Sequence, residues 1–522
     1  MIYLNHIKGK ELISAEKGDK VIELTSVKLV EAFWELCAVY PDELIIWIDR
    51  SISMKISDRL KTIFSHDLIM ASYPLETQYL PDTIGYIDQL PFINPDYSVR
   101  YPTWRMSTDI GGINGRIALR FKSLFDGIKN LGYLLNSIAK TGQQNSLFCY
   151  CEPTLVENRK SSQLKYLANT SDTFRFVAQH YKKEWLFVLF FCYKRYENKL
   201  PIKSFLSNLK NKSFFKENVD LSGILPEKIG VRNDYSVDVI IPTMGRPEHL
   251  KNVLVDLKAQ QIKPLRVIVV EQDPDETTQS QLSYLKNQEW PFEIIHRFIH
   301  RTGACHARNL ALKSVKGDFI FFADDDIRFS SDLLEKSLNE IQRLKVNALN
   351  LNCLQPAGET IFHKIKQWGA FGSGTSIVKS KFALQCRFSE NLEHGFGEDI
   401  DYGLKLRSKG CDIIYHPDIK IKHLKADIGG FRQVQNFQSK TDNIGPKPSP
   451  TMMLLVKKYY SKEMLRGYKA ALFLKYYRNQ RITNPIKYFR SMRERWNISE
   501  KMASEVLKSN RKNSKISHGK QY

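Results

Sequence analysis

Short apolar runs and helical periodicities alternate along the chain, and together they predict an α/β fold. The runs at 237–241 and 265–270 are rich in β-branched residues and have the length of strands buried on both faces. A turn at 243–247 leads into a predicted helix, whose apolar face is formed by Leu250, Val253, Leu254 and Leu257. The segment therefore predicts a βαβ unit, in which two parallel strands flank a helix.

The same alternation occupies the first part of the chain. Apolar runs at 42–49 and 67–72 predict strands, and residues 27–40 have helical spacing. A stretch rich in Gly, Pro and polar residues at 222–236 predicts a linker. We therefore expect three parts, which are an α/β domain at 1–230, a second α/β domain at 231–445, and a basic helical region with a disordered end at 446–522.

Positive charge is concentrated in the last of these parts. The chain of 522 residues has a formal net charge of +22, and residues 445–522 hold 19 Lys and Arg against 4 Asp and Glu, a net of +15. Such a tail suits a polyanion, which could be a nucleic acid, an anionic membrane surface or an anionic glycan.

Hydropathy predicts neither a targeting segment nor a membrane span. The first twenty residues have no continuous apolar core of a signal peptide. The longest apolar run, at 185–193, is too short to cross a bilayer and predicts a buried helix. The eight cysteines are scattered without paired metal-binding spacing, so we expect reduced thiols in a cytoplasmic protein.

Three consecutive carboxylates, Asp324, Asp325 and Asp326, directly follow the predicted strand at 319–323. Ligands of open parallel sheets bind beyond the carboxyl ends of the strands. Mg²⁺ commonly takes one or two carboxylates together with substrate phosphates. A surface turn or a helix N-terminus is the plain alternative for these acids, so a metal site needs support from other segments.

The segment before that strand offers an anion site. Arg301, Arg308 and Asn309 lie around the start of a predicted helix, whose N-terminus would favour a phosphate. An ordinary amphipathic helix is the alternative.

Acidic and histidine residues follow further along. Glu398 and Asp399 open a predicted helix after a glycine-rich approach, which would let carboxylates line a cleft. His416 and His423 come next, and His423 precedes a Gly-Gly loop, where a third metal ligand or a phosphate contact is expected.

Taken in order, these segments resemble the motifs of family 2 glycosyltransferases of the GT-A fold. VDVIIPTMGRPEHL is similar to the family's first strand and nucleotide loop, and ACHARN followed by GDFIFFADDD resembles the segment that leads to its DxD motif. GEDIDYGLKLRSKG resembles its ED motif and also a galactosyltransferase-like C-terminal motif, and HLKADIGGFR resembles its closing histidine segment. The order of four motifs makes the resemblance specific.

The resemblance implies a role for each matching residue. Asp324 and Asp326 correspond to the DxD pair, with Asp326 the direct metal ligand, Asp324 nearer the ribose and His423 a further ligand. Asp399 would be the general base, and Glu398 would hold the acceptor. The other residues expected at the donor are Pro242, Thr243, Arg246, Glu271, Asp273, Arg301, Arg308, Asn309 and Asp325.

One position departs from the family pattern. The family has an aspartate after its second strand to grip the base, whereas this chain reads VVEQDPD. Glu271 and Asp273 remain alternatives for that role.

The implied function is metal-dependent, inverting transfer of a sugar from a nucleotide-sugar donor to a hydroxyl of a glycan or lipid-linked glycan, with Mn²⁺ or Mg²⁺. The expected setting is bacterial surface polysaccharide synthesis, capsule or lipopolysaccharide, in the cytoplasm or on the inner face of the cell membrane. A nucleic-acid-binding protein is the competing class. We do not expect it, because the acidic motifs would repel phosphate without a cation and the sequence contains no nucleic-acid module.

The first domain has no DxD pair at a strand end, since Asp49 stands alone before Arg50. Residues 104–121 faintly resemble an acceptor-side segment. We therefore expect a degenerate GT-A-like domain that does not bind donor, and the alternative is a bifunctional polymerase with two transferase sites.

Residues 451–490 are expected to form amphipathic helices, with Met453, Leu454 and Leu455 among the apolar side chains that would face an anionic membrane. The alternative is that these helices pack on the catalytic domain.

Overall fold

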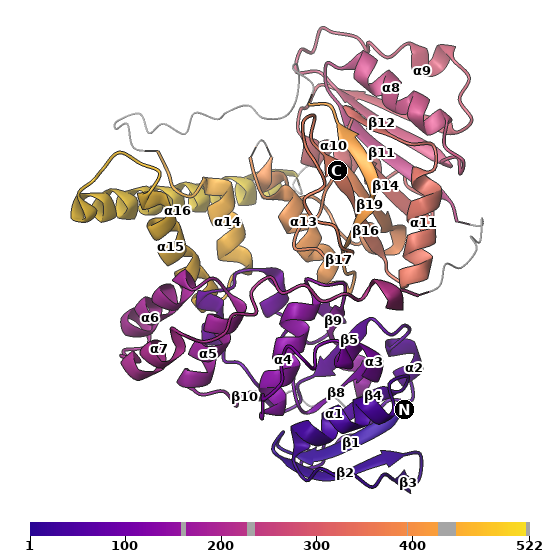
Figure 1. Ribbon diagram of the computed structural model, residues 1–522. Helices are drawn as coiled ribbons and strands as arrows, with labels where there is room; N and C mark the ends of the chain where they lie inside the picture. Colours follow the sequence, from indigo (N-terminus) through magenta and orange to yellow (C-terminus); the bar gives the residue numbers. More distant parts are fainter. Residues whose placement is uncertain (158–162, 227–234, 394, 426–444, 518–522) are drawn as a thin grey trace.

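The computed structural model has two α/β halves and a group of C-terminal helices (Figure 1). The structure describes residues 1–157, 163–226, 235–393, 395–425 and 445–517, with side chains described as far as residue 507. Each half contains one large sheet, which confirms the α/β class. Part of the expected linker, the glycine-rich end of the histidine segment and residues 518–522 lie outside the described residues. Residues 508–517, which were expected to be disordered, belong to a helix that ends at Ser517.

The second half, residues 235–425, is built on the larger sheet. Its strands are β11 (Val237–Thr243), β12 (Arg266–Gln272), β13 (Glu293–Ile299), β14 (Phe319–Ala323), β15 (Ile327–Phe329), β16 (Ala348–Leu354), β17 (Lys366–Gln367), β18 (Thr375–Lys379) and β19 (Ile414–His423). Its helices are α8 (Pro247–Lys258), α9 (Tyr284–Asn287), α10 (Ala304–Leu312), α11 (Leu333–Leu344), α12 (Ser380–Ala383) and α13 (Glu398–Arg407). The strand order is β13-β12-β11-β14-β18-β16-β19-β15, and β17 pairs with β19.

The predicted βαβ unit is present in this half. Strand β11 pairs in parallel with β12 and with β14, and all residues of β11 and β12 are buried. Helix α8 covers one face of the strands with its four expected apolar side chains, all of which are fully buried. Since parallel strands of this kind are covered on both faces, their continuous apolar sequence follows from their position.

The first half, residues 1–226, is built on a second sheet of similar design. Its strands are β1 (Ile2–Ile7), β2 (Glu11–Lys17), β3 (Lys20–Val21), β4 (Leu44–Asp49), β5 (Ile69–Tyr73), β6 (Thr77–Gln78), β7 (Tyr101–Pro102), β8 (Ile110–Asn114), β9 (Phe148–Cys151) and β10 (Lys165–Tyr166). Its helices are α1 (Leu29–Val39), α2 (Leu60–Ile63), α3 (Gly115–Leu119), α4 (Leu131–Gly142), α5 (Thr170–His180), α6 (Glu184–Tyr196) and α7 (Ile202–Asn208). The strand order is β3-β2-β1-β4-β8-β5-β9-β7, while β6 and β10 form a separate pair.

The two sheets share a core with the same chain order and the same strand directions. In the first half the core is β1-β4-β8-β5-β9, and in the second it is β11-β14-β18-β16-β19. Neighbouring strands run parallel, antiparallel, antiparallel and parallel in both. A short strand, β7 or β17, pairs antiparallel with the last core strand in each half. The shared topology supports the prediction that the first domain is GT-A-like.

The halves differ at the edge next to the first core strand. In the second half, the parallel strands β12 and β13 extend the sheet at this edge, and helix α8 connects β11 to β12. In the first half, β2 instead forms an antiparallel hairpin directly with β1. The carboxylate of Asp49, which ends β4, accepts hydrogen bonds from the backbone N–H groups of Lys8 and Ser51 and serves a turn. Helix α4 has no acidic residue in its first turn, whereas α13 has three.

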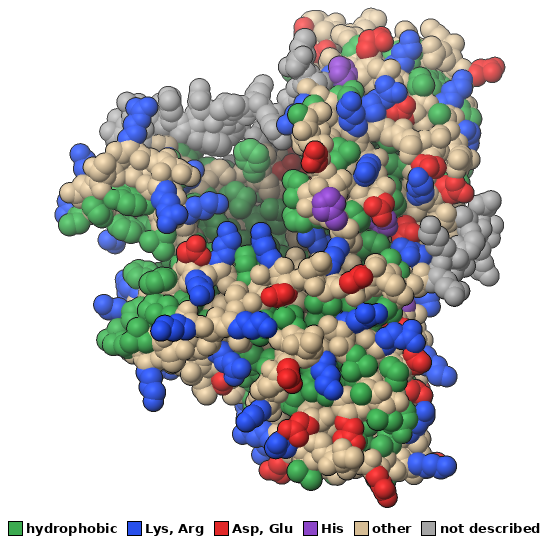
Figure 2. All heavy atoms as spheres, viewed as in Figure 1, with side chains coloured by type: hydrophobic (Ala, Val, Ile, Leu, Met, Phe, Trp, Pro, Cys, Tyr) green, Lys and Arg blue, Asp and Glu red, His purple; other side chains and the backbone are tan. Residues whose placement is uncertain are grey.

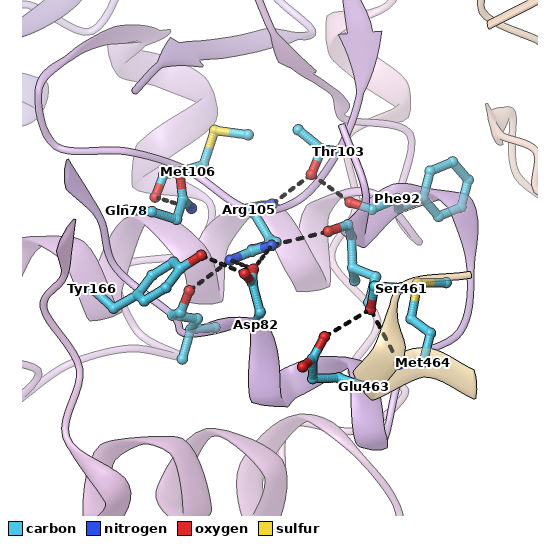
Figure 3. A network of polar contacts seen from close by, with 12 residues as sticks. Gln78, Asp82, Phe92, Thr103, Arg105, Met106, Tyr166, Ser461, Glu463 and Met464 are labelled. Carbon is cyan, nitrogen blue, oxygen red and sulfur yellow. Dashed lines mark hydrogen bonds and ion pairs between the residues drawn. The ribbon is translucent and has the colours of Figure 1, made fainter. Parts of the chain in front are cut away.

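The C-terminal helices are α14 (Pro450–Tyr459), α15 (Lys462–Tyr477) and α16 (Pro485–Ser517). Helix α15 begins against the first half, beside the 3-10 helix η1 (Asp82–Tyr86) and a buried Arg105 network (Figure 3). The hydroxyl of Ser461 caps the helix by accepting a hydrogen bond from the Met464 N–H. Gly467 allows the close approach, because a Cβ there would lie 2.2 Å from the carbonyl oxygen of Tyr86.

The packing of these helices corrects the expected membrane-facing surface. Met453, Leu454 and Leu455 are buried with exposed fractions of 0%, 7% and 2%, so their apolar face lies inside the protein. In the described part of the chain, no helix is both long enough and apolar enough to cross a membrane.

As far as it is described, the first half has no counterpart of the parallel strands β12 and β13, and this leads to a prediction about how many donor molecules one chain binds. A chain in which only the second half binds donor should show one metal-dependent nucleotide-sugar site by calorimetry, and Asp326→Ala should remove it. The full-length variant is the right test, because α15 packs on the first half. Residual stoichiometric binding to Asp326→Ala would support two transferase sites instead.

Candidate functional site

A buried strand delivers the three aspartates to the carboxyl edge of the second sheet. All five residues of β14 are buried, and Asp325 and Asp326 immediately after it are each only 4% exposed. Burial of several like charges is costly unless cations or hydrogen bonds compensate them. The groups around each carboxylate therefore show how its negative charge is compensated.

Asp324, Asp326 and His423 form a cluster with the composition of a metal site. One ligand atom from each lies within 4.8 Å of the other two. The Nε2 atom of His423 is 3.4 Å from Oδ1 of Asp326, and its buried Nδ1 has no hydrogen-bond partner in the described part of the chain. Asp324 and Asp326 lie between β14 and β15. They come close to His423 because Ile327, the first residue of β15, pairs with His423 at the end of β19. Two carboxylates and an imidazole suit Mn²⁺ or Mg²⁺.

The middle aspartate has a different environment. Asp325 accepts a hydrogen bond of 2.7 Å from the Thr243 hydroxyl and one of 2.8 Å from Arg246. Burial raises the pKa of Asp325, although the Arg246 charge and the Thr243 hydrogen bond oppose this. These bonds tie the end of β14 to the loop after β11, so Asp325, Thr243 and Arg246 hold the shape of the site. Arg246 also lies 3.4 Å from Asp326.

Arg308 on α10 compensates the remaining acids. Its guanidinium is 3.1 Å from Oδ1 of Asp324, and its side chain is only 7% exposed. The charges of Asp324, Asp399 and Glu398 all raise the pKa of Arg308 against its burial. The positive charge of Arg308 therefore interacts both with Asp324 of the DxD-like pair and with the two acids that begin α13.

Glu398 and Asp399 begin α13, and both line the same cavity as Arg308. Burial, and then the neighbouring Asp399 charge, raise the pKa of Glu398 to about 7. Burial also raises the pKa of Asp399, while Arg308 and hydrogen bonds from Ser373 oppose the shift. The Oδ1 atom of Asp399 is buried without a hydrogen-bond partner in the described residues. It can therefore accept a proton from a bound hydroxyl.

The loop before β18 is shaped around Asp324. A Cβ on Gly374 would lie 1.9 Å from Oδ2 of Asp324, and the Gly374 carbonyl accepts a hydrogen bond from the Asp324 N–H. Only glycine leaves room for the carboxylate at this point. Sequence reasoning missed Ser373 and Gly374, although the glycine-rich stretch GAFGSGT before a strand was a usable signal.

The N-terminus of α10 binds an anion, but the anion belongs to the chain. The carboxylate of Glu393 accepts hydrogen bonds from the backbone N–H groups of Cys305 and His306 at 2.9 and 3.0 Å. Glu393 was not identified from the sequence. Its two bonds satisfy the orphan donors of the first helical turn, where a phosphate had been expected.

A cavity of about 650 Å³ joins most of the expected site residues. Those that line it are Pro242, Arg246, Arg308, Asp324, Asp325, Asp326, Glu398, Asp399 and His423. Five others do not line it: Thr243, Glu271, Asp273, Arg301 and Asn309.

The five outlying residues have partners of their own. Thr243 bonds Asp325, Asn309 bonds the backbone of Phe388, and the exposed Arg301 pairs with Glu390. Glu271 contacts the Nε2 atom of His296 and accepts from Ser280, whereas the Asp273 carboxylate accepts a hydrogen bond from Asp275. His416, the other candidate histidine, pairs with Glu340 away from the cluster.

Gly374→Ala should displace the Asp324 carboxylate and weaken metal binding at least about tenfold, as expected when the support of a ligand is lost. Stabilisation by Mn²⁺ against thermal unfolding measures the effect. Gly369→Ala is the matched control, because a Cβ there would meet only ordinary contacts, the nearest at 3.8 Å. Equal Mn²⁺ responses in both variants would contradict the assigned role of Gly374.

Glu398 should make stability depend on pH. A carboxyl whose folded pKa is raised to about 7 stabilises the protein fully below its unfolded pKa and loses that contribution as pH rises through 7. Glu398→Gln should therefore match wild type near pH 4 and exceed it at pH 8, by on the order of 1 kcal/mol after discounting for partial exposure. Urea unfolding in EDTA at both pH values measures this. A difference independent of pH would be inconsistent with the raised pKa.

Comparisons with known proteins agree with this site. The family model for Glycosyl transferase family 2 matches residues 238–372. Succinoglycan biosynthesis protein ExoM of Rhizobium meliloti (strain 1021) is 33% identical over 201 residues, which cover 35% of this chain and 64% of that protein. Amylovoran biosynthesis glycosyltransferase AmsB of Erwinia amylovora is 23% identical over 261 residues, covering 45% of this chain and 83% of that protein.

Solved structures also align with part of the chain. Residues 1–349 of S. aureus TarS in complex with UDP-GlcNAc are 14% identical, with a TM-score of 0.36, and the match covers 53% of this chain and 92% of that one. GalNAc-T7 with UDP, GalNAc and Mn²⁺ is 12% identical, with a TM-score of 0.36 and coverage of 50% and 55%.

The family match begins within β11, includes the aspartates after β14 and ends at Gly372, beside the loop that shapes their site. The match therefore covers the parallel strands β13-β12-β11-β14 of the sheet. Residues 238–372 are thus similar to glycosyl transferase family 2, the family that the motifs of this segment resemble.

Proposed function

We propose that this protein is an inverting, metal-dependent glycosyltransferase, which moves a sugar from a nucleotide-sugar donor to a hydroxyl of a glycan acceptor. The observation that carries the proposal is a single cavity lined by a carboxylate–imidazole cluster, by Arg308, and by Asp399, whose buried Oδ1 has no hydrogen-bond partner in the described residues. The cluster suits a diphosphate with its cation, and Asp399 suits a reacting hydroxyl.

Asp324, Asp326 and His423 would hold the divalent cation. Such a cation neutralises the charge that develops on a diphosphate leaving group. Arg246 and Arg308 are placed to add positive charge beside it. The two arginines now pair with the aspartates, so a bound donor and cation would replace part of that charge balance.

Asp399 would take the proton of the attacking hydroxyl. Its raised pKa, caused by burial, brings it nearer to the pH at which a carboxylate is an effective base. A hydroxyl that attacks from the side opposite the diphosphate inverts the anomeric centre. Glu398 lies next to Asp399, where it would orient the acceptor through a hydrogen bond.

The proposed setting is bacterial surface polysaccharide, capsule or lipopolysaccharide, with a free or lipid-linked glycan as acceptor. The names of two relatives, which concern the biosynthesis of succinoglycan and amylovoran, support a polysaccharide product. The protein would act in the cytoplasm or on the inner face of the membrane. The first half would support the acceptor side, because it shares the sheet core but has the hairpin in place of the nucleotide-side strands.

Removing either group should abolish transfer. With a donor identified by thermal-shift screening of nucleotide sugars with Mn²⁺, release of the nucleotide should stop in excess EDTA and in Asp326→Asn. Asp399→Asn should lower the rate by about 10²–10⁴-fold while donor binding is kept, because it removes only the base. Asp318→Asn, an exposed substitution at the opposite end of β14, is the matched control. Full turnover in EDTA would disprove the metal requirement, and a wild-type rate in Asp399→Asn would disprove the base.

A further inference from the structure

Helix α6 is apolar on two sides, and only one of them is covered. The sequence predicted a buried helix over 185–193, and Leu186, Leu189 and Cys192 are fully buried as expected. Phe187 and Phe191, however, are 60% and 50% exposed. These two side chains are four residues apart and therefore lie on one face of the helix. A surface helix normally presents polar residues to water, so a second apolar face that stays half exposed or more is unusual.

Exposed apolar side chains also occur on α7 and in the loops before and after it. The ring of Phe205 on α7 lies 5.1 Å from that of Phe187, which makes the two helices contiguous here. The α6–α7 patch, as we define it, consists of Phe187, Phe191, Leu200, Ile202, Leu206 and Phe215, which are between 38% and 61% exposed. Contiguous apolar surfaces of this kind mark interaction sites in soluble proteins.

Positive charge surrounds the patch. Residues 182–216 contain nine Lys and Arg against two Glu, a net of +7. The basic residues, all exposed, are Lys182, Lys183, Lys194, Arg195, Lys199, Lys203, Lys210, Lys212 and Lys216. In Figure 2, hydrophobic and basic side chains gather together at the left of the molecule, over α6 and α7.

The patch lies beside the C-terminal helices and away from the catalytic cavity. Helix α15 packs against α6, where the guanidinium of Arg466 stacks 4.7 Å from the ring centre of Tyr196. None of the patch residues lines the cavity that holds Asp326 and Asp399. Changes to the patch can therefore be made without touching the proposed chemistry.

We propose that the α6–α7 patch attaches this protein to the surface of a bilayer that contains anionic lipids. The Phe, Leu and Ile side chains would enter the interface, and the surrounding Lys and Arg would contact lipid phosphates. The charge selects this occupant. A second copy of the chain would bring the same +7 surface against itself, which is repulsive. This proposal places membrane attachment on the first half and not on α14, whose Met453, Leu454 and Leu455 are buried.

Vesicle sedimentation of the full-length protein tests the proposal. Wild type should pellet with phosphatidylglycerol–phosphatidylcholine vesicles at low salt, pellet much less with phosphatidylcholine alone, and be released by high salt. Phe187→Glu with Phe191→Glu should lower the partition coefficient at least about tenfold, because it removes apolar insertion and adds repulsion.

Two further double variants serve as controls for the added negative charge. Val21→Glu with Val27→Glu adds the same charge at side chains that are 70% and 87% exposed elsewhere in the first half, and should change partitioning less than about twofold. Leu474→Glu with Ile486→Glu adds it on the C-terminal helices, at side chains that are 47% and 69% exposed, and should also have a small effect.

Several outcomes would overturn the proposal. They are no pelleting of wild type, an equal loss in the Val21 and Val27 pair, or a loss confined to the Leu474 and Ile486 pair. A wild type that ignores vesicles but self-associates through the patch would point to a protein partner instead. Hydrogen exchange of wild type adds a test without substitutions, because vesicles should protect the amides of residues 184–206.

The transfer proposal is checked separately in the same samples. Mn²⁺-dependent stabilisation by a nucleotide sugar should be unchanged in every patch variant, because none of the substituted residues lies in the cavity. If wild type shows no such stabilisation, the result counts against the proposed transferase function and leaves the membrane proposal unaffected.

Discussion

Repulsion among buried carboxylates at the end of β14 is the constraint around which the second half is arranged. Asp325 and Asp326 are almost fully buried, and Glu398 and Asp399 share their cavity. Such a group of acids is stable only if cations reach it. Arg246 comes from the loop after β11 and Arg308 from α10, while the imidazole of His423 lies beside Asp326 at the end of β19. The loop after β11 and α10 thus each contribute a positive charge that offsets the repulsion among the acids.

The two halves have the same sheet core but differ in the strands at one edge of the sheet. Both sheets have the same five-strand core, so the same backbone positions are available in each. The second half adds α8, β12 and β13, and it has acidic residues directly after β14 and in the first turn of α13. The first half has a hairpin there, and its Asp49 carboxylate is engaged by backbone N–H groups. Within the described residues, the first half therefore keeps the sheet core but has neither the parallel edge strands nor an acidic first turn in α4.

The C-terminal helices connect these parts. Tyr459 and Lys458 of α14 both donate hydrogen bonds to the buried carboxylate of Asp401, one helical turn after Glu398. Helix α15 then docks on the first half beside η1. The basic tail therefore braces the start of α13 against the first half, and much of its apolar surface is used for this purpose.

The sequence by itself determined the α/β class, the βαβ unit, and the residues of the metal cluster and the proposed base, because continuous apolar strands and short acidic motifs are local patterns. It could not show that Asp325 bonds Thr243 and Arg246 while Asp324 and Asp326 cluster with His423, since that depends on how adjacent strands end. The anion at α10 was also beyond it, because Glu393 is distant in sequence from the helix it caps. Above all, hydrophobicity alone could not separate the apolar residues of α6 from those of α14. Tertiary packing covers Met453 and leaves Phe187 in water, since burial depends on which surface meets a neighbour.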